Sequence, residues 1–153
     1  MNRLVACFAV FVLAAQVSGT KFKDCGSTTG QVKAVEVTDC PDSEDTCILK
    51  RGSTKGITIK FASKTGSKSV KTVIHGVIEA LGNLNLPFPL PRSKSDGCKS
   101  GLACPLKNGE NYVYNNSLDV KSFYPPFGVT VRWELKGDDN SDIVCIEIPC
   151  QIE

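Results

Sequence analysis

The sequence predicts an all-β domain, a sandwich of about seven short strands in two sheets. Apolar and polar residues alternate along several segments, as they do on strands that bury only one face. Clusters of turn-forming residues separate these segments, at 64–69, 82–85, 105–110 and 137–140. No internal repeat or linker divides the chain. Short strands at this spacing in one undivided chain are typical of a two-sheet sandwich.

The alternation is found at four places along the chain. The apolar positions are Val35 and Val37, then Ile57, Ile59 and Phe61, then Val129, Val131, Trp133 and Leu135, and finally Val144, Ile146, Ile148, Cys150 and Ile152. The segment 70–81 is ambiguous. Its β-branched beginning favours a strand, whereas 77–81 is also compatible with a short turn of helix.

The first residues have the pattern of a secretory signal peptide. Arg3 precedes twelve apolar residues, 4–15, and Val17-Ser18-Gly19 supplies the small residues that cleavage requires. A membrane anchor is the alternative interpretation, but a span needs about twenty apolar residues. We therefore expect a signal peptide at 1–19 and a mature domain at 20–153, soluble and secreted, with the lysosomal lumen as a second expected location.

The charge balance argues against a nucleic-acid partner. The chain has 18 Lys and Arg against 16 Asp and Glu, a net charge of +2. Lys64, Lys68 and Lys71 are spread along a polar loop and are not interleaved with aromatic residues. A solvated face explains them, and weak attraction to anionic lipid headgroups is the alternative.

The cysteines predict three disulfides and one free thiol. Cys7 lies in the leader, and seven cysteines follow it. Two pairs close short loops, Cys40–Cys47 and Cys98–Cys104. Cys145 points away from the apolar face of the last strand, so Cys25 pairs with it, in a long loop that contributes on the order of 4 kcal/mol. Cys150 remains as a buried structural thiol, because no neighbour in sequence would lower its pKa.

Other chemistry finds little support in the sequence. A zinc site is the competing interpretation of clustered cysteines, but no C-x-x-C pair occurs, and we expect no metal. The single histidine, His75, has no serine motif around it, and the carboxylates crowd into solvated turns, so we expect no enzyme. Asn115-Asn116-Ser117 is a sequon for N-glycosylation at Asn115.

Two stiff apolar loops do not match an ordinary core. The first, 84–91, has prolines at 87, 89 and 91, which exclude it from the interior of a sheet and predict a loop at a sheet edge that presents Phe88 and Leu90. The second, 120–127, places aromatic residues around Pro125 and Pro126. The loops form either a lid over the core or the rim of an apolar pocket, and the pattern alone does not separate the two.

Several short motifs resemble the ML lipid-recognition domain family, which includes the soluble Niemann–Pick type C sterol carriers and the mite group-two allergens. The matching segments run through the whole mature chain in the family's order. They are 22–27, 75–76, 87–91, 96–101 with 104–105, 120–122 with 124–125, Trp133, and 147–149 with 151–152.

The resemblance implies an immunoglobulin-like sandwich with the same three disulfides and a lipid pocket between the sheets. It implies that unesterified sterol binds there and passes to a membrane or a membrane transporter, with a monomeric protein and no cofactor. The implied pocket residues are Phe88, Val120 and Tyr124, then Leu86, Pro125 and Trp133, with Ile57, Ile59, Val35 and Val37 as strand walls. His75, Gly76, Val77 and Lys99 correspond to a surface that meets membranes in the family.

Three departures from the family leave the choice of lipid open. The stretch between Gly76 and Pro87 is longer than in the vertebrate carriers, Cys150 replaces an apolar residue, and 54–63 lacks a sequon often found there. A sterol carrier is therefore the first hypothesis. A secreted carrier or recognition module for a fatty acid, signalling lipid or microbial lipid is the second. A sandwich hydrolase is the third, and it lacks an identifiable nucleophile.

Overall fold

The computed structural model describes residues 19–153. The predicted signal peptide and Cys7 therefore lie outside the described residues, apart from Gly19. None of the helices within 19–153 has the length and apolar character needed to cross a membrane.

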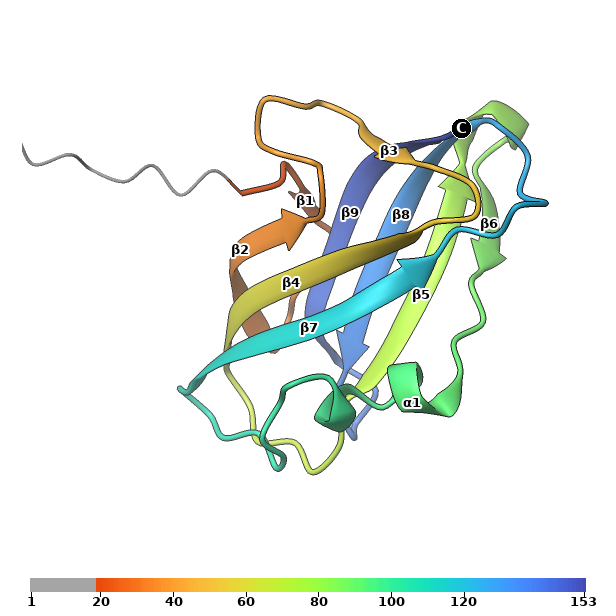
Figure 1. Cartoon of the computed structure of the whole chain (residues 1–153). Helices are drawn as coiled ribbons and strands as arrows, with labels where there is room; N and C mark the ends of the chain where they lie inside the picture. The colour runs from red at the N-terminus through yellow and green to blue at the C-terminus, as the bar shows by residue number, and fades with distance from the viewer. Residues whose placement is uncertain (1–18) are drawn as a thin grey trace, which may run out of the picture.

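Two sheets packed face to face form a sandwich, as the sequence predicts (Figure 1). The larger sheet has six strands, and its main order is β1 (Lys23–Asp24), β9 (Asp142–Ile152), β8 (Gly128–Lys136), β5 (Lys71–Ile78) and β6 (Leu84–Pro87). Its sixth strand, β3 (Cys47–Leu49), runs parallel to β9. The smaller sheet has the order β2 (Gly30–Val37), β4 (Thr54–Ser63) and β7 (Asn111–Asp119), and it lies in front of the larger one in Figure 1. The very short β1 and β3 account for the strands beyond the predicted number.

Helical structure in the described chain is confined to connections. It comprises the 3₁₀ turns η1 (Glu79–Leu81) and η2 (Gly97–Lys99) and the four-residue helix α1 (Arg92–Ser95). The ambiguous segment 70–81 therefore contains both predicted structures, a strand that ends at Ile78 followed by a short helical turn. Gly82 ends that turn with φ 71°, a left-handed conformation that suits glycine.

Alternation along the strands builds the core between the sheets. On β8 the apolar residues are buried and their neighbours are not, and Trp133 is opposite Ile74 on one side and Ile146 on the other. β7 supplies Tyr112 and Tyr114 from the smaller sheet. Neither tyrosine has a clear core signal in the sequence, because Asn116 interrupts the apolar pattern of this strand.

The proline segment differs from its prediction in one respect. Its first half, Leu84–Pro87, is a strand, although an outermost one that pairs with β5 alone. The Phe88 amide donates to the Ile74 carbonyl at 2.9 Å, so Leu86 and Leu84 also direct their backbone toward β5. The Pro87 backbone then faces outward, and its missing N–H removes no hydrogen bond from the ladder.

One edge of the sandwich is held closed. The structure contains the disulfides Cys25–Cys145, Cys40–Cys47 and Cys98–Cys104, the pairs expected from the sequence. Cys40 bridges to the end of β2, and Cys47 begins β3, so the second disulfide joins the two sheets. At the other end of β2, a Cβ at Gly30 would lie 2.2 Å from the Ile143 carbonyl oxygen, so β2 approaches β9 too closely for any side chain at Gly30. The functional site lies at the opposite edge, beside β5 and β6.

Candidate functional site

An apolar cavity of about 280 Å³ opens at the end of the sandwich beside β6. Its walls come from β5 and β6, from the loop 120–127, and from the neighbouring ends of β8 and β9. The lining residues are Gly76, Ile78, Leu86, Pro87, Phe88, Pro89, Phe123, Tyr124, Pro125, Phe127, Val129 and Ile152. Tyr124 is the one lining residue with a polar side-chain atom, so this mouth cavity suits a hydrocarbon surface.

Aromatic rings from both stiff loops meet at the mouth. The Phe88 and Tyr124 rings are edge to face, with centroids 5.7 Å apart and an interplanar angle of 69°. Phe123 packs edge-on against Tyr124 at 5.3 Å, yet 78% of Phe123 is exposed. Burial and the nearby Asp119 carboxylate raise the pKa of the Tyr124 hydroxyl, which therefore stays neutral. The two loops thus meet through uncharged aromatic rings at the mouth.

The Phe88 ring packs directly against Gly76 of β5. A Cβ at this position would lie 2.6 Å from Phe88 Cε2 and 3.0 Å from Val129 Cγ2. Both distances are below ordinary van der Waals contact, so any side chain at this position would displace the ring. The absence of a side chain on β5 therefore sets how deeply Phe88 sits in the mouth.

A second cavity, of about 30 Å³, lies between the sheets. The smaller sheet and its flanks contribute residues such as Val37, Ile57 and Leu118, and the larger sheet contributes Val131, Trp133, Ile148 and Cys150. Val129 and Val131 are successive inward residues of β8, one in each cavity, and Ile152 and Cys150 have the same relationship on β9. The two cavities therefore lie end to end along one apolar path.

A buried polar cluster lies beyond Trp133. The Tyr114 hydroxyl is 2.7 Å from Thr72 Oγ1, and it accepts hydrogen bonds from Asn116 Nδ2 at 2.7 Å and Trp133 Nε1 at 3.3 Å. Burial raises the pKa of this phenol. Because Thr72 is on β5 and Tyr114 on β7, the cluster joins the two sheets and forms a floor under the apolar path.

The structure distributes the predicted pocket residues over three environments. Leu86, Phe88, Tyr124 and Pro125 line the mouth cavity, and Val37, Ile57 and Trp133 line the inner one. Val35, Ile59 and Val120 are buried in the core and line neither cavity. The sequence analysis did not name Ile78 and Val129 as pocket residues, although both continue the inward alternation of their strands.

The four residues predicted to meet membranes do not share one face. His75 and Val77 are half-buried on the outer side of β5, whereas Gly76 is buried beneath Phe88. Lys99 is exposed in η2, near Asp96, which bridges to Lys71 at the beginning of β5. Membrane contact by these residues remains a prediction.

Two features of the described chain concern metal and thiol chemistry. Glu134, Asp142 and Cys145 lie close together, but Cys145 is in a disulfide and Lys136 lies 3.8 Å from Glu134 and 3.0 Å from Asp142. Lys136 therefore already forms ion pairs with both carboxylates. The free thiol of Cys150 lines the inner cavity, where burial raises its pKa to about 12. It remains protonated at neutral pH and behaves as an apolar residue.

Comparison with known proteins identifies the family. Residues 19–152 match the ML domain. The chain belongs to the ML domain family. A relative from Bos taurus, named NPC intracellular cholesterol transporter 2, is 40% identical over 100% of this chain and 99% of its own length. NPC intracellular cholesterol transporter 2 homolog a from Drosophila melanogaster is also 40% identical, over 98% of this chain and 97% of its own.

A solved structure supports the fold of this ML domain. The crystal structure of a Niemann-Pick type C2 protein from Japanese carpenter ant has a TM-score of 0.79 and 29% identity. The similarity covers 87% of this chain and 99% of the ant chain. The two-sheet arrangement around the cavities is therefore that of this family.

Proposed function

We propose that this protein is a secreted lipid carrier that binds an unesterified sterol between its sheets and transfers it to a membrane or a membrane transporter. The observation that carries the proposal is the apolar path from the aromatic rings at the mouth to Trp133. Two relatives that match almost the whole chain are named as cholesterol transporters, which supports a sterol as the ligand. The process forms and breaks no covalent bond.

Binding requires the sheets to separate. The inner cavity holds about 30 Å³, whereas sites for small molecules typically measure about 300–1,000 Å³. The edge with the Cys40–Cys47 disulfide and the close Gly30–Ile143 contact resists opening. The sheets therefore separate at the edge of β5, β6 and β7. Burial of sterol rings and tail contributes about 25 cal/mol per Å² of apolar surface, which offsets the separation.

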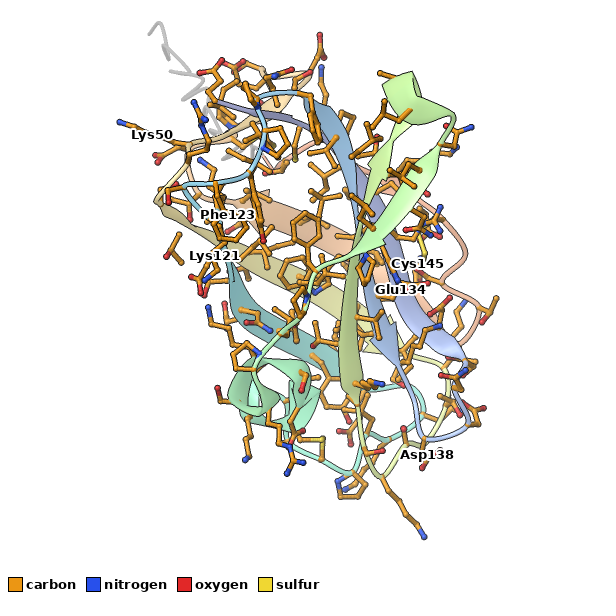
Figure 2. The ribbon with its side chains drawn as sticks, turned by 90° about the vertical axis from the view of Figure 1, so that its right-hand side faces the viewer. Lys50, Lys121, Phe123, Glu134, Asp138 and Cys145 are labelled. Atoms are coloured by element: carbon orange, nitrogen blue, oxygen red, sulfur yellow. A yellow bond between two sulfur atoms is a disulfide. The ribbon has the colours of Figure 1, made fainter. Side chains whose placement is uncertain are left out.

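Release occurs at the mouth. Phe123 is largely exposed there, next to the prolines at 125 and 126. The turn that contains Lys50 packs against the same loop, because Gly52 N donates to the Val120 carbonyl at 2.7 Å. Figure 2 shows Lys50, Phe123 and Lys121 along the upper left side of the molecule, with Asp138 at the lower right. An aromatic side chain flanked by lysines suits the headgroup region of a bilayer, so a sterol passes into lipid without crossing water.

A separate structural feature supports a second class of ligand, lipids with longer chains than a sterol. The turn η1 directly follows Ile78, a mouth residue, and exposes Leu81 to 61%. An exposed leucine three residues from a mouth residue offers apolar surface for a longer chain, such as that of a fatty acid, a signalling lipid or a microbial lipid. Mass spectrometry of lipids extracted from secreted protein separates the classes, because the dominant amphiphile is either a sterol or it is not.

Saturable binding of a fluorescent sterol tests the proposal. We expect binding by the wild-type protein and a loss of affinity of at least about tenfold for Phe88→Ala, since a buried phenylalanine contributes about 1.5–3 kcal/mol. Phe22→Ala is the matched control, because Phe22 packs near β1, at the edge of the larger sheet opposite β6. Absence of saturable binding, or equal affinities for the Phe88 variant and the wild type, would overturn the proposal.

A further inference from the structure

We propose that Asn115 carries an N-linked glycan, and that this glycan projects from a face of the protein that takes no part in lipid transfer. The glycan site itself is independent of the carrier function, whereas the statement about lipid transfer rests on the proposed function. Its basis is the outward placement of Asn115, the first residue of the sequon, on β7.

Asn115 points outward from the smaller sheet. It is opposite Thr58 in the ladder, on the outer face, and its side chain is exposed. Thr58 Oγ1 donates to Asn115 Oδ1 at 2.8 Å, which leaves the Nδ2 amide directed away from that contact. Among residues 19–153, Asn115 Nδ2 has no hydrogen-bond acceptor. This nitrogen is the atom that the glycan would modify.

Asn116 does not begin a sequon, because Leu118 follows two residues later, and its side chain is also engaged in hydrogen bonds. It faces the interior, and its Nδ2 donates to the Lys94 carbonyl at 2.8 Å and to the Tyr114 hydroxyl at 2.7 Å. Its Oδ1 accepts from the Ser117 amide. Ser117, the third residue of the sequon, lies on the outer face with Asn115 and is opposite Gly56. The strand therefore exposes Asn115 and the hydroxyl residue of its sequon, Ser117, on the same face.

The surface around Asn115 has room for the first sugars. A hollow of about 380 Å³ lies over Gly56 and Thr58, with Glu36 and Thr38 at its rim and Asn115 in its wall. Its polar groups suit carbohydrate better than lipid. This outer face belongs to the sheet in front in Figure 1, whereas the mouth lies between the sheets and beside β6. A glycan on this face leaves the mouth free.

Intact mass measurement tests the site. The full chain is expressed in cultured insect cells, and protein from medium and lysate is treated with peptide-N-glycosidase. Wild type, Ser117→Thr and Asn111→Gln should lose mass on treatment, whereas Asn115→Gln and Ser117→Ala should lose none. Asn111 is the matched control, since it is an exposed asparagine at the beginning of the same strand without a sequon. An unchanged mass for treated wild type, or a mass loss in Asn115→Gln, would overturn the proposal.

The second half of the proposal has its own readout. Sterol transfer to phosphatidylcholine vesicles is measured for wild type before and after enzymatic removal of the glycan. We expect rates within twofold of each other, because the modified face is distant from the mouth. A larger change would show that the glycan contacts the delivery surface, and it would refute this half alone.

Discussion

Thr72 Oγ1 and the Tyr114 hydroxyl lie 2.7 Å apart across the interface between the two sheets. Tyr114 already accepts two hydrogen bonds, so its own proton is donated to Thr72. Both residues are buried. This contact is therefore a polar crosslink at the floor of an otherwise apolar path.

Tyr114→Phe should destabilise the fold. The substitution leaves the Trp133 N–H and the Thr72 hydroxyl without their partner, at a cost of about 1–3 kcal/mol. Urea unfolding measures the loss. The double variant with Thr72→Val should lose less than the sum of the single variants, because it removes both members of the pair. Additive losses would mean that the two hydroxyls are not coupled.

Gly76→Ala should weaken sterol binding more than it weakens the fold. The added methyl group displaces the Phe88 ring from its position, and we expect about a tenfold loss of affinity, equivalent to about 1.4 kcal/mol. Titration with a fluorescent sterol checks the value. Gly128→Ala is the control, since its Cβ would be 3.6 Å from the nearest atom, an ordinary contact. Equal effects of the two substitutions would argue against a role of the Gly76–Phe88 contact in sterol binding.

Cys150 should make the stability of the wild type sensitive to alkaline pH. The pKa of the thiol in the folded protein, about 12, is above its ordinary value of 9.0. The stabilising contribution of the buried neutral thiol is therefore fully present below pH 9 and is lost as the pH rises toward 12. Compared with Cys150→Val, the wild type should lose about 1.4 kcal/mol between pH 8 and pH 10. Tyr114 is present in both proteins, so its own titration cancels in the difference. Parallel pH profiles would contradict the prediction.

Two surfaces are candidates for the membrane contact, the mouth with Phe123 and the surface that contains His75, Val77 and Lys99. If the mouth meets the bilayer, Phe123→Ser should slow sterol transfer to vesicles about tenfold and weaken affinity in solution by less than that, because Phe123 lines the mouth but is 78% exposed in the free protein. Phosphatidylserine in the vesicles should accelerate the wild type through Lys50 and Lys121. Val113→Ser, an exposed apolar residue on the outer face of the smaller sheet, is the control.

The alternative is the surface implied by family resemblance. His75→Ala, Val77→Ser and Lys99→Ala would each slow transfer if that surface makes the contact. Normal transfer by Phe123→Ser together with slow transfer by the His75 and Lys99 variants would assign delivery to the outer side of β5 and η2.

The sequence allowed the strands, the disulfides and the stiff loops to be predicted, because each has a local signal. Alternation with a period of two marks the inward side of a strand, and proline restricts the backbone wherever it occurs. β6 shows the limit of such reasoning. A proline within a strand is compatible with an edge, and whether Leu84–Pro87 pairs depends on the outward direction of the Pro87 backbone, which neighbouring residues do not determine.

The sequence by itself predicted most of the inward residues of the strands and the two apolar loops, and it contains no recognisable serine-nucleophile motif. Only the tertiary structure decided which apolar residues line the mouth, such as Leu86 and Phe88, and which are buried in the core, namely Val35, Ile59 and Val120. It also placed Gly76 beneath Phe88 and brought Thr72 to Tyr114. These relationships join residues from different strands and sheets. The packing of one sheet on the other sets them, and no local pattern encodes the distance between two sheets.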